Sequence, residues 1–342
     1  MAIDKVVSAS ITDSAVTSAK VAAGVLHPNF KNLFINGDMS IAQRGTTSSS
    51  TGYQTVDRWQ LNTGTQQEQK TDTPDARFSN SFEVTGTTGG SSGYGICAQR
   101  IESKNVLSAL GQTCTLSAYV KNTGTSTVNV SVEVYRANST DSFSGLTLLT
   151  SLTGQAITTS WNRITFPSFT VTDACATGIE VRIFRYDASN DQEWLITGVQ
   201  LEVGSSASDF EFLPFDVNLQ RCQRYYHSIY NRSAGTNPNT DSVDLCVGTD
   251  YDGSQMFIMP VLPVTMRTLP SVVQTTGTDF CLALRNGSQD LFDGFGGTGN
   301  SGNNNLAIWT SGSNYSGSSG VSVRVRIGNS GAAYKLAANA EV

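Results

Sequence analysis

Alternating apolar and polar residues recur along most of the chain, and their period of two is the one that a β-strand requires. In each of the segments 116–121, 130–135 and 179–184, aliphatic residues take every second position and polar or aromatic residues take the others. Such segments predict half-buried antiparallel strands, each with one apolar face and one mixed polar and aromatic face.

Residues 194–204 also alternate, and we assign their side chains to two opposite faces of one strand. One face takes Leu195, Thr197, Val199, Leu201 and Val203, and the other takes Ile196, Gly198, Gln200 and Glu202. Near the start of the chain, residues 32–35 show the same alternation before the turn-forming residues 36–38. We expect these two segments to be the opening and closing strands of one β-sandwich, so that its ends meet.

A helical pattern is convincing at one place, after the boundary segment 204–216. Asp216 is positioned to cap a helix whose apolar residues repeat at helical spacing. These residues are Leu219, Cys222, Tyr226 and Ile229. Strand patterns return from about residue 241 and are clearest at 321–327, while 294–305 and 311–320 are rich in Gly, Asn and Ser and predict loops.

The first 30 residues have a different period, because every fifth residue is apolar. The apolar residues are Met1, Val6, Ile11, Val16, Val21 and Leu26. A period of five suits neither one face of a helix nor one face of a strand, and thirty residues cannot bury a core by themselves. Two interpretations stay open: a stalk whose apolar positions are buried by sister chains, which we favour, and a disordered leader.

These patterns predict an all-β protein with four parts. An extended N-terminal leader occupies residues 1–30, a β-sandwich residues 31–210, a linker with a short helix residues 211–240, and a second, β-rich C-terminal head residues 241–342. The composition agrees, because 32 of the 342 residues are Gly and only 15% are charged, as expected for many short strands joined by tight turns.

Charge and hydropathy exclude several classes of protein. The net charge is −6, so a nucleic-acid-binding surface is not expected. No apolar run approaches the roughly 18 residues of a membrane-spanning helix, and the N-terminus lacks the basic and apolar regions of a secretory signal. The six cysteines form no CxxC pair, and we interpret them as buried thiols of a protein made in a reducing cytoplasm.

Candidate catalytic residues are scarce. A Ser-His-acid triad would have to use His27 or His227, and neither has catalytic residues around it in the sequence. The densest acidic cluster, Asp187, Asp191 and Glu193, could supply the paired carboxylates of a glycan hydrolase, but we interpret it as the solvated loop of a hairpin. We therefore expect a protein without enzymatic activity.

Six polar and aromatic residues of the predicted sandwich strands share the outward parity and form the first candidate binding surface. They are Tyr119, Lys121, Glu133, Tyr135, Arg182 and Phe184. Such side chains suit a sugar ring, through stacking and paired hydrogen bonds, and they suit a subunit interface equally well. By contrast, Trp59, Trp161 and Trp194 lie next to strand patterns and are interpreted as core residues.

The second candidate surface lies in the predicted head. Four aromatic residues, Phe292, Phe295, Trp309 and Tyr315, are set among Gly, Ser and Asn. Rigid aromatic rings beside small polar residues are typical of recognition loops, so this segment is our predicted receptor contact. The alternative is that Trp309 and Ile308 belong to a core strand, since residues 306–310 have strand character.

Three motifs, in this order, resemble the receptor-binding or tail-fibre proteins of tailed bacteriophages. They are NLFINGDMSIAQRG…DRW at 32–59, ITGVQLEVG at 196–204 and LQRCQRYY at 219–226. The first two also resemble carbohydrate-binding modules of the jelly-roll type. The resemblance implies a jelly-roll-like sandwich in a trimeric virion protein of the tail, made in the host cytoplasm, whose residues 1–30 attach it to another virion protein.

The resemblance to jelly-roll modules also implies a structural calcium ion where the first and last strands meet. Asp38 and Glu202 occupy suggestive positions there and would supply the hard oxygen ligands that calcium needs. The other interpretation is a turn aspartate and an outward-facing glutamate. No further cofactor is expected.

The sequence therefore predicts a non-enzymatic, homotrimeric tail fibre or receptor-binding protein of a bacteriophage, which recognises a glycan or a protein of the bacterial surface. The alternative is a structural virion protein, such as a head fibre, an adaptor or a baseplate decoration. A glycan-degrading tailspike is the less favoured third hypothesis. Neither nucleic-acid binding nor membrane insertion is expected.

Overall fold

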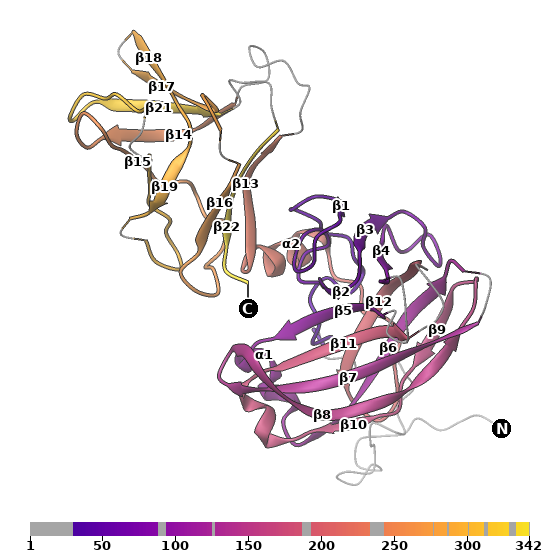
Figure 1. Ribbon diagram of the computed structural model, residues 1–342. Helices are drawn as coiled ribbons and strands as arrows, with labels where there is room; N and C mark the ends of the chain where they lie inside the picture. Colours follow the sequence, from indigo (N-terminus) through magenta and orange to yellow (C-terminus); the bar gives the residue numbers. More distant parts are fainter. Residues whose placement is uncertain are drawn as a thin grey trace, which may run out of the picture.

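A computed structural model shows two β-sheet bodies that meet near helix α2, Phe215–Gln223 (Figure 1). The predicted leader, apart from residue 30, and the acidic residues Asp187 and Asp191 lie outside the residues that the structure describes. The described residues are 30–87, 94–124, 127–186, 193–232, 243–275, 277–285, 287–299, 301–310, 314–327 and 333–341.

The first body is a sandwich of two sheets whose principal strand pairs are antiparallel. The first sheet has the order β1-β3-β4-β12-β6-β10, with β9 also paired to β6. Its strands are β1 (Thr47–Ser48), β3 (Gln66–Lys70), β4 (Ser81–Thr85), β6 (Gln112–Asn122), β9 (Asn162–Thr165), β10 (Phe169–Val171) and β12 (Glu193–Val203). The second sheet has the order β2-β5-β11-β7-β8. Its strands are β2 (Gln60–Thr63), β5 (Tyr94–Ile101), β7 (Val128–Ser139), β8 (Ser142–Ile157) and β11 (Ile179–Tyr186).

The core of the sandwich is built from the aliphatic residues that alternate along its central strands. These are Leu116, Ala118 and Val120 of β6, Val130, Val132 and Val134 of β7, and Ile179, Val181 and Ile183 of β11. Trp59 and Trp194 are fully buried in the same cluster. The all-β sandwich and the inward faces of these three strands are therefore confirmed.

Strand β12 departs from the strict alternation that its sequence predicts. Its pairing with β6 shifts register between Thr197 and Gln200, and Gly198 has a left-handed φ of 57°. A glycine in this conformation adds one residue to the strand, so the side chains beyond it exchange faces. The core residues of β12 are Trp194, Ile196, Val199 and Leu201. The predicted division of residues 195–203 into two faces is wrong, because this bulge exchanges the faces halfway along.

The segment that opens the sandwich contacts β12, although it is not the predicted strand. The amide of Leu33 donates to the carbonyl of Leu201 at 2.9 Å, and the amide of Val199 donates to the carbonyl of Gly37 at 2.9 Å. The side chain of Asn32 donates to the Val199 carbonyl at 2.9 Å and accepts from the Leu201 amide at 3.1 Å. The two ends of the sandwich therefore meet, with bends and turns in place of a strand at residues 32–41.

Helix α2 lies where a helix was expected, but it is shorter than expected. It ends at Gln223, and Tyr226 and Ile229 lie instead in strand β13 (Tyr226–Arg232). Asp216 lies in the first turn, after the N-cap residue Pro214. The sequence pattern overextends the helix because β13 pairs with β22, and this long-range pairing outweighs local helical spacing. The other helical elements described are α1 (Ser103–Val106) and the 3₁₀ turns η3 (Leu107–Ala109) and η4 (Asp173–Thr177).

The second body, the head, also has two sheets, ordered β13-β22-β16 and β18-β17-β21-β14-β15-β20-β19. Besides β13, the smaller sheet contains β16 (Ser271–Gln274) and β22 (Tyr334–Asn339). The larger sheet contains β14 (Val243–Asp250), β15 (Met256–Ile258), β17 (Cys281–Arg285), β18 (Ser288–Phe292), β19 (Phe295–Thr298), β20 (Ile308–Thr310) and β21 (Ser322–Ile327). Because β13 pairs within the head, the head begins before the predicted boundary at residue 241.

A buried cluster of charges fixes the head to the sandwich. The carboxylate of Glu341 contacts the guanidinium groups of Arg44, at 3.1 Å, and of Arg58, and all three side chains are at most 7% exposed. Arg44 stacks on Tyr226 with 3.7 Å to the ring centroid, and Arg58 stacks on Tyr225 at 3.5 Å. These contacts compensate the desolvation of three charges, which would otherwise oppose burial.

Further hydrogen bonds cross the same junction. Gln43 Nε2 donates to the carbonyl of Tyr226 at 2.7 Å, and Lys335 Nζ donates to the carbonyl of Arg44 at 2.5 Å. Arg224 forms an ion pair with Glu102 of the sandwich at 3.0 Å. The first and third motifs of the phage resemblance, 32–59 and 219–226, thus supply much of the joint between the two bodies.

The close approach at Gly37 predicts that Gly37→Ala destabilises the sandwich. A Cβ at this position would collide with the carbonyl oxygen of Val199 and lie 3.0 Å from Asn32 Nδ2. Overpacking against backbone is expected to lower the free energy of unfolding by about 1–3 kcal/mol, measured by denaturant titration. Gly145→Ala is the matched control, because its Cβ would meet only the exposed, movable side chain of Asn138. Equal effects of both variants would contradict the close approach.

The buried carboxyl of Asp57 predicts a pH-dependent stability. Burial, only partly offset by Arg44 and Gln43, raises the pKa of Asp57 from 3.8 to about 6. Because the pKa is raised in the folded state, protonation of Asp57 stabilises the fold. This contribution to stability is fully present below about pH 4 and is lost as the pH rises through about 6. The free energy of unfolding of the wild type, relative to Asp57→Asn, should therefore fall by up to about 3 kcal/mol between pH 4 and pH 7. If the difference in the free energy of unfolding between the wild type and Asp57→Asn stayed constant across this range, the pKa of Asp57 would not be raised.

Candidate functional site

The six residues predicted to form one outward face lie on two different sheets. Glu133 and Tyr135 of β7 and Arg182 and Phe184 of β11 belong to the second sheet. Tyr119 and Lys121 lie on β6 of the first sheet, so the prediction of a single six-residue face is wrong. Parity along a strand shows which side chains point away from the core, but it does not show which of the two sheets carries the strand.

The outward side of the second sheet carries a continuous row of charged side chains. Glu180 of β11 is placed directly opposite Arg100 on one side and Tyr135 on the other. Its carboxylate accepts hydrogen bonds from Arg100 Nε and Arg182 Nε, each at 2.6 Å. The side chain of Glu180 is fully buried between the two arginines. We call this surface the β11 face; it consists of Arg100, Glu133, Tyr135, Glu180, Arg182 and Phe184.

Tyr135 and Glu133 extend the row along β7. The Tyr135 hydroxyl donates to Glu133 Oε2 at 2.6 Å, and the Arg182 guanidinium lies over the Tyr135 ring, 4.4 Å from its centroid. Burial, followed by the hydrogen bond to Glu133, raises the pKa of Tyr135, so the phenol keeps its proton at neutral pH. The half-buried side chains are therefore held in fixed positions by one another.

Sequence reasoning missed Arg100 and Glu180, the residues that hold the row in place. Glu180 has the same parity as Arg182, which is a signal that could have included it. The position of Arg100 beside Glu180 depends on the pairing of β5 with β11, and the sequence pattern does not specify that pairing. Both carboxylate oxygens of Glu180 are bound to arginines, so this group holds the guanidinium planes and is poorly placed to act as an acid or a base.

Tyr119 and Lys121 face outward from the first sheet, where they have partners of their own. Lys121 Nζ lies 2.5 Å from Asp72 Oδ2, and the indole N–H of Trp161 donates to Asp72 Oδ1 at 2.8 Å. Burial by itself would raise the pKa of Asp72, but the hydrogen bonds from Lys121 and Trp161 outweigh it, and the pKa is lowered. Trp161 is half-buried in this cluster, so its predicted place in the core is wrong.

Three of the four aromatic residues of the predicted receptor contact lie in the core of the head. Phe292, Phe295 and Tyr315 are 0, 3 and 5% exposed. The rings of Phe295 and Tyr315 pack edge-on against Phe292, and the Tyr315 hydroxyl donates to the buried Asp250. The prediction that these three residues lie on an exposed loop is therefore wrong. Their aromatic rings instead fill the interior of the glycine-rich head. Trp309 alone of the four remains half-exposed.

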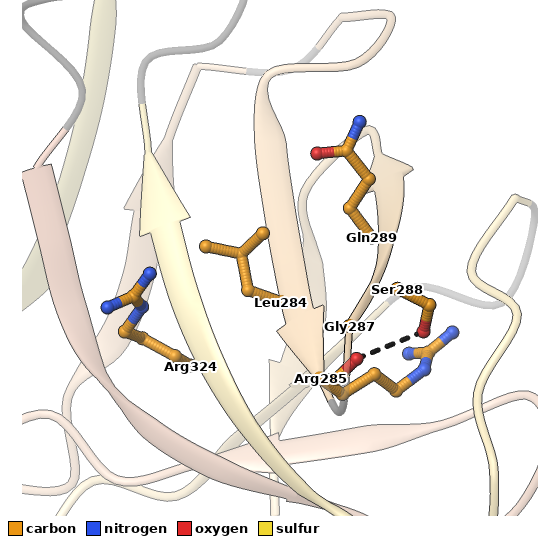
Figure 2. A pocket seen from close by; sticks show the side chains of 6 residues that line it. All are labelled: Leu284, Arg285, Gly287, Ser288, Gln289 and Arg324. Atoms are coloured by element: carbon orange, nitrogen blue, oxygen red, sulfur yellow. Dashed lines mark hydrogen bonds between the residues drawn. The ribbon is translucent and has the colours of Figure 1, made fainter.

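The head also has a surface hollow of about 430 Å³ at the turn between β17 and β18 (Figure 2). Its lining includes Arg285 and Arg324, but Figure 2 shows the two side chains extending in opposite directions. Arg285 donates to the Tyr315 hydroxyl at 3.0 Å, and Arg324 lies 3.5 Å from Asp244. The two charges thus serve separate partners and do not converge on one ligand.

Asp38 and Glu202, the predicted calcium ligands, are each surrounded by hydrogen-bond donors. Asp38 Oδ1 accepts from Asn218 Nδ2 at 3.0 Å, and burial raises the pKa of Asp38. Glu202 accepts from the amide and the hydroxyl of Ser208, at 2.8 and 2.6 Å. Calcium requires a shell of oxygen ligands, and a calcium site at these two carboxylates stays a prediction. The structure gives the calcium prediction no support.

Two further findings concern metals and membranes. Within the described ranges, no group of three or more His, Cys, Asp and Glu side chains is arranged to hold a metal ion. None of the helices that the structure describes is long and apolar enough to cross a membrane.

No protein-family model and no curated protein matches the chain. Among solved structures, the CBM22-1 xylan-binding domain of Xyn10C from Paenibacillus barcinonensis is similar, with a TM-score of 0.33 and 13% identity over 49% of this chain and 97% of that one. The enzymatically active domain of tailspike protein 4 from bacteriophage CBA120 has a TM-score of 0.34 and 15% identity, over 51% of this chain and 22% of that one. The family 11 carbohydrate-binding module from Clostridium thermocellum has a TM-score of 0.30 and 14% identity, over 47% and 96%. Similarities this distant carry no argument about what the chain binds.

Proposed function

We propose that this chain is a non-enzymatic receptor-binding protein of a bacteriophage tail, and that the β11 face binds a glycan of the bacterial surface. The observation that carries the proposal is the row of Arg100, Glu180 and Arg182, fixed beside Tyr135 on the outward side of a sheet. The phage assignment rests on the three sequence motifs, whereas the ligand class rests on the chemistry of this face.

A glycan suits the β11 face because a sugar presents neighbouring hydroxyl groups on a rigid ring. Guanidinium and carboxylate groups with fixed planes can bond two neighbouring hydroxyls at once, and an aromatic ring supports the apolar side of the sugar. Arg182 and Glu133 are half-buried, so they meet a ligand without the full entropic cost of ordering long surface side chains.

The contacts of the two carboxylates of the β11 face support binding without cleavage. A glycan hydrolase needs an acid and a base or nucleophile that flank the scissile bond. Glu180 is buried between two arginines, and Glu133 shares a hydrogen bond with Tyr135. Both carboxylates are thus held by other side chains of the β11 face and do not flank an open space for a scissile bond as such a pair must. Of the acidic cluster considered from the sequence for glycan hydrolysis, Asp187 and Asp191 lie outside the described residues and Glu193 lies within them.

The alternative function, a structural virion protein, would use the β11 face for contact with another subunit. Arginine and tyrosine are enriched at protein interfaces as well as at sugar sites. Direct binding of a purified polysaccharide distinguishes the two, because a structural decoration has no need of glycan affinity.

Binding should be detected on an array of purified bacterial surface polysaccharides and then measured by calorimetry with the polysaccharide that binds. Arg182→Ala should weaken binding about 10- to 100-fold, since hydrogen bonds to a charged group contribute about 1.5–3 kcal/mol each. Arg77→Ala is the matched control, because Arg77 lies outside the β11 face and is mostly exposed. No release of reducing ends is expected during incubation. Equal affinity of Arg182→Ala and wild type would refute the site, and released reducing ends would refute a pure binding function.

The five-residue apolar period of residues 1–30 supports a homotrimer and attachment of this segment to another virion protein. Light scattering on the full chain should give three times the mass of one chain, independent of concentration. Deleting residues 1–30 should leave a folded protein that still binds the polysaccharide but no longer joins particles. A full chain that stays monomeric at all concentrations would contradict the trimer.

A further inference from the structure

The outward side of the larger head sheet, together with the segments that follow β14 and β15, exposes an unusual amount of apolar surface. Its residues include the four most exposed large apolar side chains that the structure describes, Val261, Val247, Met259 and Tyr251, at 82, 69, 68 and 67%. The half-buried rings of Phe257 and Trp309 lie beside them. We call these six residues the β15 face.

Strand register and ring contacts bring most residues of the β15 face together, and Val261 follows Met259 two positions along the chain. Thr249 pairs with Phe257 and Gly248 with Ile258, a register that leads from Val247 across to Met259. Phe257 pairs in turn with Trp309 of β20. The ring centroids of Tyr251 and Phe257 are 5.4 Å apart, and those of Phe257 and Trp309 are 5.8 Å apart. The three rings therefore form one continuous row, and the strand register places Val247 and Met259 beside it.

Residues 297–299 lie against the indole of Trp309 and restrict its position. A Cβ at Gly299 would lie 3.0 Å from the Trp309 indole, and one at Gly297 would lie 3.6 Å from it. These two positions approach opposite edges of the indole, so the ring lies against residues 297–299, where a larger side chain would displace it. Trp309 is thus fixed in place with its remaining surface toward solvent, as in a preformed contact site.

The sequence of this region is typical of a strand that is covered on both sides. Residues 256–259 read MFIM, a run without polar alternation, and Met256 and Ile258 fill the core on one side. Strands buried on both faces have such continuous apolar runs, whereas strands that face solvent alternate. Within the described residues, however, the side of Phe257 and Met259 has no comparable cover.

The composition of the β15 face favours a protein partner over a sugar. Aliphatic residues as exposed as Val261 and Met259 offer no hydrogen bonds to hydroxyl groups, and an exposed apolar patch of this kind marks a protein contact. Tyr, Trp, Phe, Met and Arg are the residues enriched at such contacts. At the edge, Arg324 and Arg326 share the carboxylate of Asp244, so both signs of charge border the face.

The identity of the partner follows from the rest of the chain. Residues 1–30 lie almost entirely outside the described residues, and their apolar positions every five residues require sister copies if they form a stalk. A stalk of sister chains brings their heads together about one axis. We infer that the β15 face packs against a second copy of this chain, so that the heads of the proposed homotrimer join through it; this inference rests on the trimer proposed above.

Cysteine cross-linking in the full chain tests the contact. Val261→Cys places a thiol at the most exposed position of the face, and Leu107→Cys, at a position 57% exposed on the sandwich, is the matched control. Mild oxidation should link Val261→Cys into covalent dimers several-fold more than Leu107→Cys or the wild type, whose cysteines are buried or half-buried. Adding Met259→Asp should abolish the link, because it places like charges at the contact.

The outcomes separate this inference from the function proposed above. A trimeric Val261→Cys protein that cross-links no more than the control would overturn the inference and leave the trimer standing. A monomeric full chain would overturn both. If Trp309→Ala lost polysaccharide binding while Val261→Cys stayed unlinked, the β15 face would be a glycan surface and the inference would be wrong. Unchanged polysaccharide binding by Met259→Asp is expected, because the β11 face lies in the other body.

Discussion

The buried charge cluster around Glu341 is the interaction on which the arrangement of the two bodies depends. Two arginines of the sandwich, Arg44 and Arg58, are almost without solvent, and each is stacked on a tyrosine from the region after helix α2. Burying them would be costly without counter-charges, which come from Asp57 of the sandwich for Arg44 and from Glu341, near the C-terminus, for both arginines. The sandwich, the helix and the head are therefore not independently placed modules, since each contributes part of one electrostatic joint.

This joint also explains what the motifs of the phage resemblance do in the fold. The first motif supplies Arg44 and Arg58 and the loop that bonds to β12, and the third supplies Tyr225 and Tyr226. The recognisable residues are thus structural, and they hold the chain in one arrangement. The candidate binding face, with Glu180 and Arg182, contains none of them. A resemblance carried by such motifs indicates a common architecture more directly than a common ligand.

Much of the fold could be predicted from period alone, because a sheet with one buried face enforces alternation in β6, β7, β11 and β21. The prediction failed where the backbone departs from the regular pleat, as at Gly198. It also failed where long-range strand pairing determines the secondary structure, as at Tyr226 in β13. The site was only partly predictable for the same reason. Alternation identifies Tyr135 and Arg182 as outward residues, but only strand pairing places Glu180 beside Arg100 and separates Tyr119 from both.

The sequence positions of the partners in the charge cluster have a consequence for how the protein is made. Arg44 and Glu341 are separated by 297 residues, so the ribosome must add all of these residues after Arg44 before this ion pair can form. At roughly 5–20 residues per second this takes on the order of 15–60 s, during which Arg44 has Asp57 of the sandwich as its acidic partner and Arg58 lacks its ion pair with Glu341. Until Glu341 is made, the buried ion pair between Arg58 and the head cannot form, and the junction lacks its central contact. The joint therefore closes late in synthesis, after the strands of both bodies that it connects have been made.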